Sequence, residues 1–226
     1  MKLTENLFFY PEREMPSCNT YVIKDEVSVI IDTGLEMHLQ GLIQDMRQDG
    51  IKPEDIDLIT NTHLHLDHCW ANQAFKNISG AKIVIHALQK EHIQLNLEVV
   101  TNFFAPFLNF EPKTIEFIED SLLDSKLNTG IMEFELLHTP GHSPDCICFF
   151  NKKEGILICG DVVFNQSTGR VDIPGGNAKE IKRSIEMLSQ LEIEYLLPGH
   201  LNIIKGKEAI KRNFDFVREY VFPWLY

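Results

Sequence analysis

Apolar residues gather along this chain into short runs that polar turns separate, a pattern typical of β-strands. The first three runs cover residues 3–9, 19–24 and 27–32, and residues 10–16 are expected to form a loop between the first two. Further strands are expected at residues 57–62, 81–86, 113–137 (in short pieces), 145–150, 155–159 and 193–198.

Apolar residues at helical spacing predict helices between these strands. In residues 36–48 they fall on one face, and Asp49 and Gly50 then end the helix. Asn177 is expected to cap the start of another helix, because its side chain can accept from the first free N–H groups. The remaining helices are expected at residues 67–76, 87–100 and roughly 207–221.

Two stretches of the chain follow the same order of elements. Residues 29–63 and residues 156–200 each run from an apolar strand through an aspartate and a helix to a second strand that ends in histidine. This weak repeat suggests two related halves whose strand ends face a shared cleft. Two mixed sheets with helices outside would give an αββα sandwich of the α/β class. We predict one such domain over residues 1–226.

Charge and composition narrow the classes of partner. The 226 residues include 21 Lys and Arg against 33 Asp and Glu, which gives a net charge of −12 and argues against nucleic acid or an anionic membrane as the partner. No apolar run approaches the roughly 18 residues of a membrane span, and no signal peptide is evident. The 5 cysteines are scattered, so we expect reduced thiols in a cytoplasmic protein.

The run His63, His65, Asp67 and His68 places four groups that can ligate a metal within six residues of chain. It follows the apolar strand expected at residues 57–62, and open α/β sheets carry their chemistry at the carboxyl ends of strands. His63 and His65 are two residues apart, so they can point the same way from an extended segment. Asp67 and His68 point differently, so this one loop could serve two ions.

Three further candidates end later strands or turns beside a glycine, which lets the backbone bend sharply. Two sets of three donors can then be formed around one shared carboxylate, and each ion keeps room for a bridging water. We expect two divalent ions, zinc first, with iron or manganese also compatible with these donors. The first set is His63, His65 and His142, the second is Asp67, His68 and His200, and the bridging residue is Asp161.

Together these motifs resemble the metallo-β-lactamase superfamily, and glyoxalase II (hydroxyacylglutathione hydrolase) within it. The resemblance implies an αββα fold and hydrolysis of a thioester, ester, lactam, lactone or phosphodiester. It covers nearly the whole chain through Asn19–Tyr21, Asp32–Gly34, Thr62–His68, Thr139–Ser143, Gly160–Asp161, Gly169–Asp172 and Pro198–His200.

The chain also departs from the glyoxalase II pattern. Cys69, Trp70 and Ala71 stand where that family has a small residue and two glycines, and Leu201 replaces a glycine after the last histidine. The basic residues that grip glutathione there cannot be aligned with those near the end of this chain. The metal chemistry therefore carries over by resemblance, whereas recognition of glutathione does not.

We therefore expect a metal-dependent hydrolase that attacks a thioester or ester carbonyl of a small-molecule substrate with a metal-bridging hydroxide. Asp67 would orient that hydroxide as well as ligate. Asp32 and Asp172 are candidates to orient the histidines, although Asp32 could instead cap a turn. Arg170 would hold either Asp172 or a substrate carboxylate, or would form only a surface salt bridge.

Other functions remain compatible with these residues. A persulfide dioxygenase of the same superfamily would bind one iron through His63, His142 and Asp161. A lactonase would use the same hydrolytic site, and a non-catalytic metal-containing module would keep the ligands without turnover. The Phe-rich residues 103–110 would form core, a wall over the site or a dimer contact, so a homodimer is a further expectation.

Overall fold

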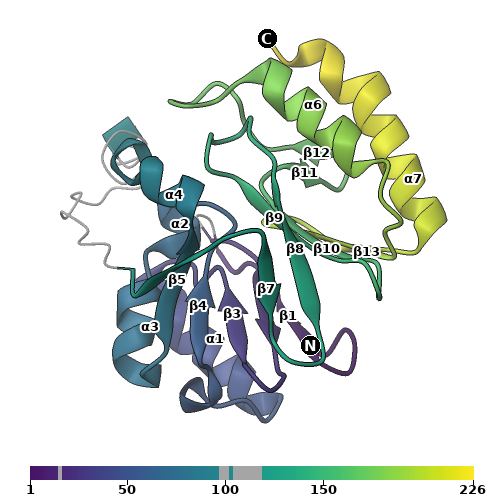
Figure 1. Ribbon diagram of the computed structural model, residues 1–226. Coiled ribbons are helices and arrows are strands. Elements are labelled where there is room, and N and C mark those ends of the chain that lie inside the picture. The colour runs from purple at the N-terminus through teal and green to yellow at the C-terminus, as the bar shows by residue number, and fades with distance from the viewer. Residues whose placement is uncertain (15–16, 97–101, 104–118) are drawn as a thin grey trace.

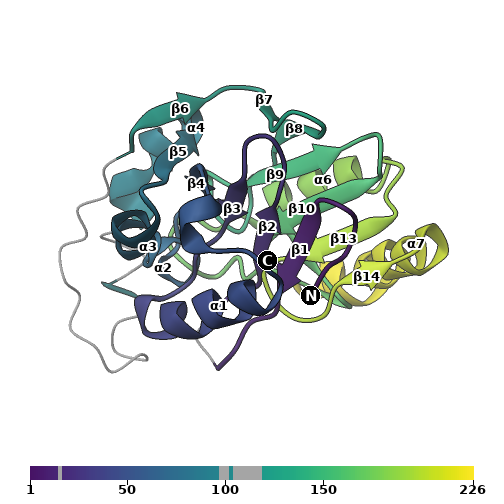
Figure 2. The same cartoon turned by 90° about the horizontal axis from the view of Figure 1, so that it is seen from below.

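The computed structural model describes residues 1–14, 17–96, 102–103 and 119–226 (Figure 1). Two mixed sheets pack face to face, and helices cover the outer side of each, which confirms the αββα sandwich. Figures 1 and 2 show α1 and α3 outside the first sheet, with α6 and α7 outside the second. The roles expected of the Phe-rich residues 103–110 concern a segment that, from residue 104 onward, lies outside the described residues.

The first sheet has the strand order β1-β2-β3-β4-β5-β6. Its first three strands pair antiparallel, and β3 to β6 pair parallel. The strands are β1 (Leu7–Tyr10), β2 (Thr20–Ile23), β3 (Val29–Ile31), β4 (Leu58–Thr60), β5 (Lys82–His86) and β6 (Ser121–Leu123).

The second sheet has the order β14-β13-β10-β9-β8-β7, in which only β10 and β13 pair parallel. A separate ribbon joins β11 to β12. The strands are β7 (Lys126–Asn128), β8 (Glu133–His138), β9 (Ile147–Asn151), β10 (Ile156–Gly160), β11 (Val163–Phe164), β12 (Ser167–Thr168), β13 (Tyr195–Pro198) and β14 (Ile204–Lys205).

The helices match the sequence pattern at α1 and α6, where Asn177 caps the start of α6 as expected. The helix of the last segment continues past α7 as a π-helical turn. The helical elements are α1 (Glu36–Gln48), η1 (Pro53–Asp55), α2 (Leu66–Cys69), α3 (Asn72–Ser79), α4 (Ala87–Glu91), α6 (Ala178–Leu188), α7 (Lys207–Phe216), η3 (Val217–Val221) and η4 (Phe222–Trp224).

Three boundaries differ from the sequence prediction. The helix expected at residues 67–76 is two helices, because the N–H of Ala71 donates to the carbonyl of Gly34 (2.8 Å) and leaves the helical ladder. The first strand starts at Leu7, since the preceding residues form a turn whose N–H groups donate to Leu7 O. Helix α4 ends at Glu91, His92 forms a turn, and residues 93–96 are helical again, while residues 97–100 of the predicted helix lie outside the described residues.

Three apolar clusters separate the four layers, and strands contribute to two of them in alternation. In β3, Val29 and Ile31 pack between the sheets while Ile30 faces α1. In β10, Ile158 packs between the sheets while Leu157 faces α6 and α7. Strands buried on both faces have continuous apolar sequences, which explains the unbroken runs in the pattern.

The weak repeat is visible in the topology. Strands β3 and β4 flank α1, β10 and β13 flank α6, and each pair of strands is parallel. Asp32 and His63 follow the strands of the first unit, and Asp161 and His200 follow those of the second. The sandwich therefore brings four candidate residues to the carboxyl ends of two equivalent strand pairs.

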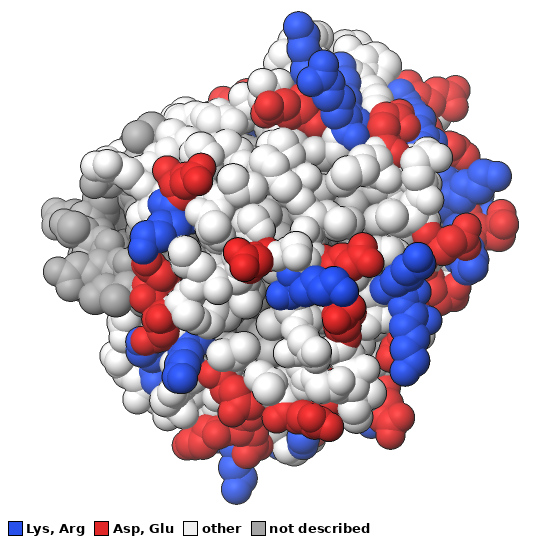
Figure 3. Space-filling model, viewed as in Figure 1, with Lys and Arg blue, Asp and Glu red and all other residues white. Residues whose placement is uncertain are grey.

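The 5 cysteines are buried and free, as expected for core thiols. In the C-terminal tail, Phe222 and Leu225 pack on the outer cluster of the second sheet, while Trp224 is 72% exposed. Among the described residues, no helix is both long and apolar enough to cross a membrane. The face in Figure 3 intersperses acidic and basic side chains around a wide uncharged area.

Candidate metal centre

The seven candidate ligands come together from four loops. They follow β4, β8, β10 and β13, so both sheets contribute. Each donor atom lies within 4.8 Å of the others in its group. The groups are His63, His65 and His142; His63, His68 and Asp161; and Asp67, His68 and His200.

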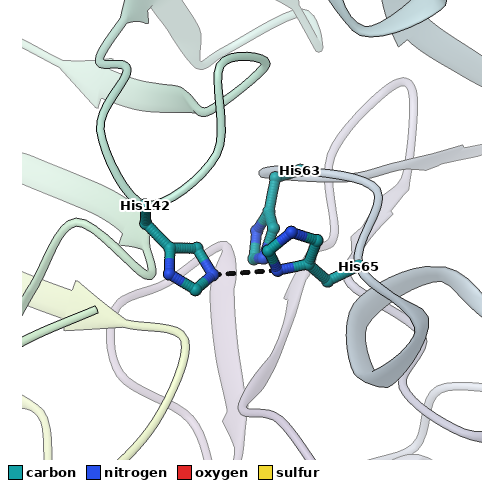
Figure 4. Close-up of side chains that lie close together, drawn as sticks. All are labelled: His63, His65 and His142. Atoms are coloured by element: carbon teal, nitrogen blue, oxygen red, sulfur yellow. Dashed lines mark hydrogen bonds between the residues drawn. The ribbon is translucent and has the colours of Figure 1, made fainter. Parts of the chain in front are cut away.

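The first group consists of three imidazoles that converge, as Figure 4 shows. His65 turns Nδ1 toward Nε2 of His142, 2.9 Å away. The ring of His63 lies 4.4 Å from that of His65 and 5.0 Å from that of His142, centroid to centroid. All three residues are buried, so their nitrogens face one another and not solvent.

The group of Asp67, His68 and His200, called the second group from here on, combines a carboxylate with two imidazoles. Nε2 of His200 lies 3.3 Å from Oδ2 of Asp67 and 3.4 Å from Nε2 of His68. Oδ2 of Asp67 is 3.9 Å from Nε2 of His68. Asp67 is the more open member, with 23% of its side chain exposed, so one side of this group can meet a substrate or water.

Asp161 lies between the two groups. Its Oδ2 is 3.5 Å from Nε2 of His142, in the first group, and 3.3 Å from Nε2 of His200, in the second. Its Oδ1 is 3.3 Å from Nε2 of His68. One carboxylate thus contacts donors of both groups, which is the arrangement that a bridging ligand requires.

Two glycines make room for Asp161. Gly160 has a φ of +49°, and a Cβ there would lie 2.4 Å from Oγ1 of Thr62. A Cβ on Gly199 would lie 2.2 Å from Oδ1 of Asp161 and 2.8 Å from Cε1 of His68. These close approaches explain why glycine stands before Asp161 and before His200.

Acceptors on the far side of three rings fix which nitrogen faces the centre. Nδ1–H of His68 donates to Oδ2 of Asp32 (3.0 Å), and Nδ1–H of His142 donates to the carbonyl of Arg170 (2.8 Å). Nδ1–H of His200 donates to Oε2 of Glu12 (2.8 Å). In the neutral form, which carries one N–H, these contacts place that proton on Nδ1 and leave Nε2 of each ring with a free lone pair.

Asp32 supports both groups. Its Oδ2 accepts from His68 and from the hydroxyl of Thr62 (2.7 Å), and that hydroxyl lies 3.2 Å from Nδ1 of His63. Its Oδ1 accepts from the backbone N–H of Thr62 (2.8 Å). Asp32 is fully buried, and its φ is +61°. Its hydrogen bond from His68 is the contact with a histidine that was expected from the sequence.

The structure corrects the expected position of Asp172. Its carboxylate pairs with the guanidinium of Arg170 in two hydrogen bonds of 2.9 and 2.8 Å, at an exposed position. The carbonyl of Arg170, and not a carboxylate, orients His142. A backbone carbonyl carries no residue signature, so the sequence could not single it out.

Burial keeps the first group neutral. Burial and neighbouring histidines lower the pKa of His63 and His65 well below the ordinary value, and burial lowers the pKa of His142 despite the opposing charge of Asp161. Nε2 of His63 is also buried without a hydrogen-bond partner among the described residues. Neutral imidazoles with buried, unpaired lone pairs suit a metal ion.

The second group is strongly charged. Burial alone would lower the pKa of His68, but Asp161, Asp32 and Asp67 raise it to about 10. Burial also opposes the charged form of His200, but Asp161, Asp67 and Glu12 raise its pKa. The charge of His68 and hydrogen bonding to His200 outweigh burial and lower the pKa of Asp67 to about 2. Without an ion, protons on the two imidazoles thus balance the carboxylates, and a divalent cation would have to displace the protons from Nε2 and supply that positive charge instead.

Sequence reasoning missed two supporting carboxylates. Asp145 is fully buried and accepts from Leu64 N (3.1 Å) and from the hydroxyl of Ser143, so it ties the loop of His63 to the loop of His142. Its place three residues after His142 was the available signal. Glu12 lies 188 residues from its partner His200, and nothing in the local sequence marks it.

Comparisons with known proteins show which proteins this chain is similar to. The family model described as the metallo-beta-lactamase superfamily matches residues 14–200. A probable metallo-hydrolase of Methanocaldococcus jannaschii is 33% identical over 210 residues, which cover 91% of this chain and 95% of the relative. An acyl-coenzyme A thioesterase of Homo sapiens is 26% identical over 242 residues, covering 95% of this chain and 85% of the relative.

A solved structure shares the architecture. The crystal structure of the B3 metallo-beta-lactamase BLEG-1 superposes with a TM-score of 0.75 and 26% sequence identity. The match covers 97% of this chain and 99% of that one.

Proposed function

Because this chain belongs to the metallo-beta-lactamase superfamily, we propose that it hydrolyses a carboxylic thioester or ester with two divalent metal ions. The observation that carries the proposal is the position of Asp161, whose Oδ2 lies within 3.5 Å of His142 and 3.3 Å of His200. His63, His65 and His142 would hold one ion, and Asp67, His68 and His200 the other. Zinc is the first choice, and iron and manganese suit the same donors.

The residues of the chain set up the reaction around these ions. Two bound ions would lower the pKa of a shared water toward neutrality and polarise the substrate carbonyl. Asp67 stays ionised, since its pKa is lowered to about 2, so its carboxylate can accept a hydrogen bond from that water and orient it. The buried imidazoles keep bulk water away from one side, and the half-open second group receives the carbonyl.

One relative supports the choice of a thioester. The human protein at 26% identity is named as an acyl-coenzyme A thioesterase, and the alignment covers 95% of this chain. A thiolate is a good leaving group, so a site that activates water needs little further acid catalysis to release it. Cys69–Ala71 and Leu201 depart from the glyoxalase II pattern, so we do not include glutathione in the proposal.

The test begins with protein purified without added metal. Elemental analysis should find about two ions per chain, and a panel of acyl-coenzyme A thioesters, aryl esters and lactones should include a hydrolysed substrate. Asp161→Ala should lose turnover and retain fewer ions. The matched control is Asp215→Ala, which replaces an exposed aspartate on α7 and should retain both the turnover and the bound ions of wild type.

Other results would overturn the proposal. One iron per chain, with oxygen uptake on a persulfide and no hydrolysis, would assign the centre to a dioxygenase that uses His63, His142 and Asp161. Two ions without turnover of any panel member would favour a binding module. Lactone turnover alone would place the protein among the lactonases.

A further inference from the structure

We propose that Glu12 is a positioning residue that sets the orientation of His200 and thereby the affinity of the Asp67, His68 and His200 group for its ion. This inference rests on the proposed two-metal function. Glu12 lies in the segment between β1 and β2, far from the ligands in sequence. Its Oε2 accepts from Nδ1–H of His200 (2.8 Å), and its Oε1 accepts from the N–H of Leu201 (3.0 Å).

The segment that carries Glu12 is itself anchored to the last ligand loop. The N–H of Glu12 donates to Oδ1 of Asn19 (2.9 Å). Nδ2 of Asn19 donates to the carbonyls of Pro198 and Leu201, each at 2.9 Å, and its N–H donates to the carbonyl of Gly199 (2.7 Å). Asn19 thus fixes the backbone on both sides of His200, which leaves the direction of the ring to Glu12.

His200 needs such a partner more than the other histidines do. Its side chain is 21% exposed, whereas that of His68 is fully buried and that of His142 is 7% exposed. The ring of Phe164 borders His200 at 5.7 Å, edge to face, but a ring contact does not choose between the two nitrogens. The hydrogen bond to Glu12 makes that choice, because it places the proton on Nδ1 and directs Nε2 to the centre.

The effect should be confined to one ion. His63 and His142 take their orienting contacts from Thr62 and from the carbonyl of Arg170, which belong to other loops. Residues that orient a ligating histidine typically change metal affinity by about 10–100-fold when they are replaced. We therefore expect loss of Glu12 to weaken one of two binding events and to spare the other.

Titration of metal-free protein with Zn²⁺ against a competing chelator tests this. Wild type should bind two ions, and Glu12→Ala should bind one of them about 10–100-fold more weakly while the other keeps its affinity. Glu12→Gln keeps one acceptor oxygen and should recover part of the loss. Glu14→Gln, an exposed glutamate on the same segment, is the matched control and should match wild type.

A Co²⁺ titration identifies which ion is affected. The absorption spectrum of Glu12→Ala with one equivalent of Co²⁺ should match that of His200→Ala, because both variants should fill the three-histidine group alone. Far-UV circular dichroism of the metal-free variants checks folding, and if Glu12→Ala is unfolded, the Glu12→Gln titration decides.

The outcomes separate this inference from the function on which it rests. Unchanged affinities in Glu12→Ala and Glu12→Gln, or equal losses at both ions, would overturn the role of Glu12 and leave the two-metal hydrolase standing. Two ions in wild type, with the expected loss of affinity for one of them in Glu12→Ala but no hydrolysis, would overturn the function alone. A single ion in wild type would overturn both.

Discussion

Replacing Asp32 tests how the ligand loops are held before any metal binds. Alanine removes an acceptor from four buried donors. Three of them, the N–H and the hydroxyl of Thr62 and Nδ1–H of His68, lose their acceptor, whereas Nδ2 of Asn61 still donates to the carbonyl of His68. Each buried donor left without a partner costs about 1–3 kcal/mol. The backbone φ of +61° already disfavours aspartate, which has a Cβ as alanine does, so it adds little to this change. Three donors without a partner put the loss of free energy of unfolding in Asp32→Ala at about 3–9 kcal/mol, a large part of the roughly 5–15 kcal/mol available to a domain.

Two companion variants divide this loss. Asp32→Gly removes the same acceptor but tolerates the left-handed backbone, so it should be less destabilised than the alanine variant by about 1 kcal/mol. Asp32→Asn tolerates the backbone and keeps one oxygen for the N–H of Thr62. Its amide N–H₂ would then face Nδ1 of His68, so the protein should fold while His68 changes the nitrogen that carries its proton.

Urea unfolding at pH 7 with a chelator present measures these differences, since bound metal would otherwise add its own stabilisation. Nitrogen chemical shifts of the His68 ring report its protonated nitrogen in Asp32→Asn. A loss below about 1 kcal/mol in Asp32→Ala would refute the hydrogen-bond argument. Equal stability of the alanine and glycine variants would refute the contribution of the backbone.

Three further changes test other parts of the structure. Gly199→Ala should displace the carboxylate of Asp161 and weaken metal binding in a chelator titration, whereas Gly206→Ala, with open space around its Cβ position, should keep wild-type metal affinity. Leu201→Gly should raise the free energy of unfolding by about 1 kcal/mol in urea, because Leu201 has a φ of +64° and is 49% exposed. Burial opposes the charged form of Asp25, but hydrogen bonds from a threonine hydroxyl and from backbone N–H groups lower its pKa below the ordinary value. The stability that Asp25 contributes is therefore present above about pH 4, so the difference between wild type and Asp25→Asn in urea unfolding should be constant near neutrality and shrink as the pH falls through the folded pKa.

The ligand positions were accessible to sequence reasoning because each donor lies in the loop or turn that follows an apolar strand. His63 and His200 end strands of equivalent units, and Asp161 follows a glycine that permits a sharp turn. The side-chain types alone then limit the chemistry to metal binding. The contacts among these donors follow from the sandwich, which the repeat of strand, aspartate, helix, strand and histidine already suggested.

The groups that orient the ligands were less accessible, for physical reasons. The carbonyl of Arg170 acts through the backbone, so its residue type is irrelevant, and the exposed carboxylate of Asp172 satisfies the guanidinium instead. Glu12 reaches His200 only because the segment between β1 and β2 meets the last ligand loop in three dimensions. The break between α2 and α3 likewise depends on a carbonyl from a distant loop, that of Gly34. Each of these depends on tertiary contacts that local pattern does not encode.

The order of the ligands along the chain has a consequence for biosynthesis. Every side chain of the three-histidine group has been made once translation reaches His142, whereas the other group waits for His200. An ion captured early would hold the His142 loop against the first sheet while β10 and β13 are still being synthesised. Asp161 would then join an ion already in place, and His200 would complete the second group last. Metal supply during translation should therefore influence the yield of folded chain as well as the activity of the finished protein.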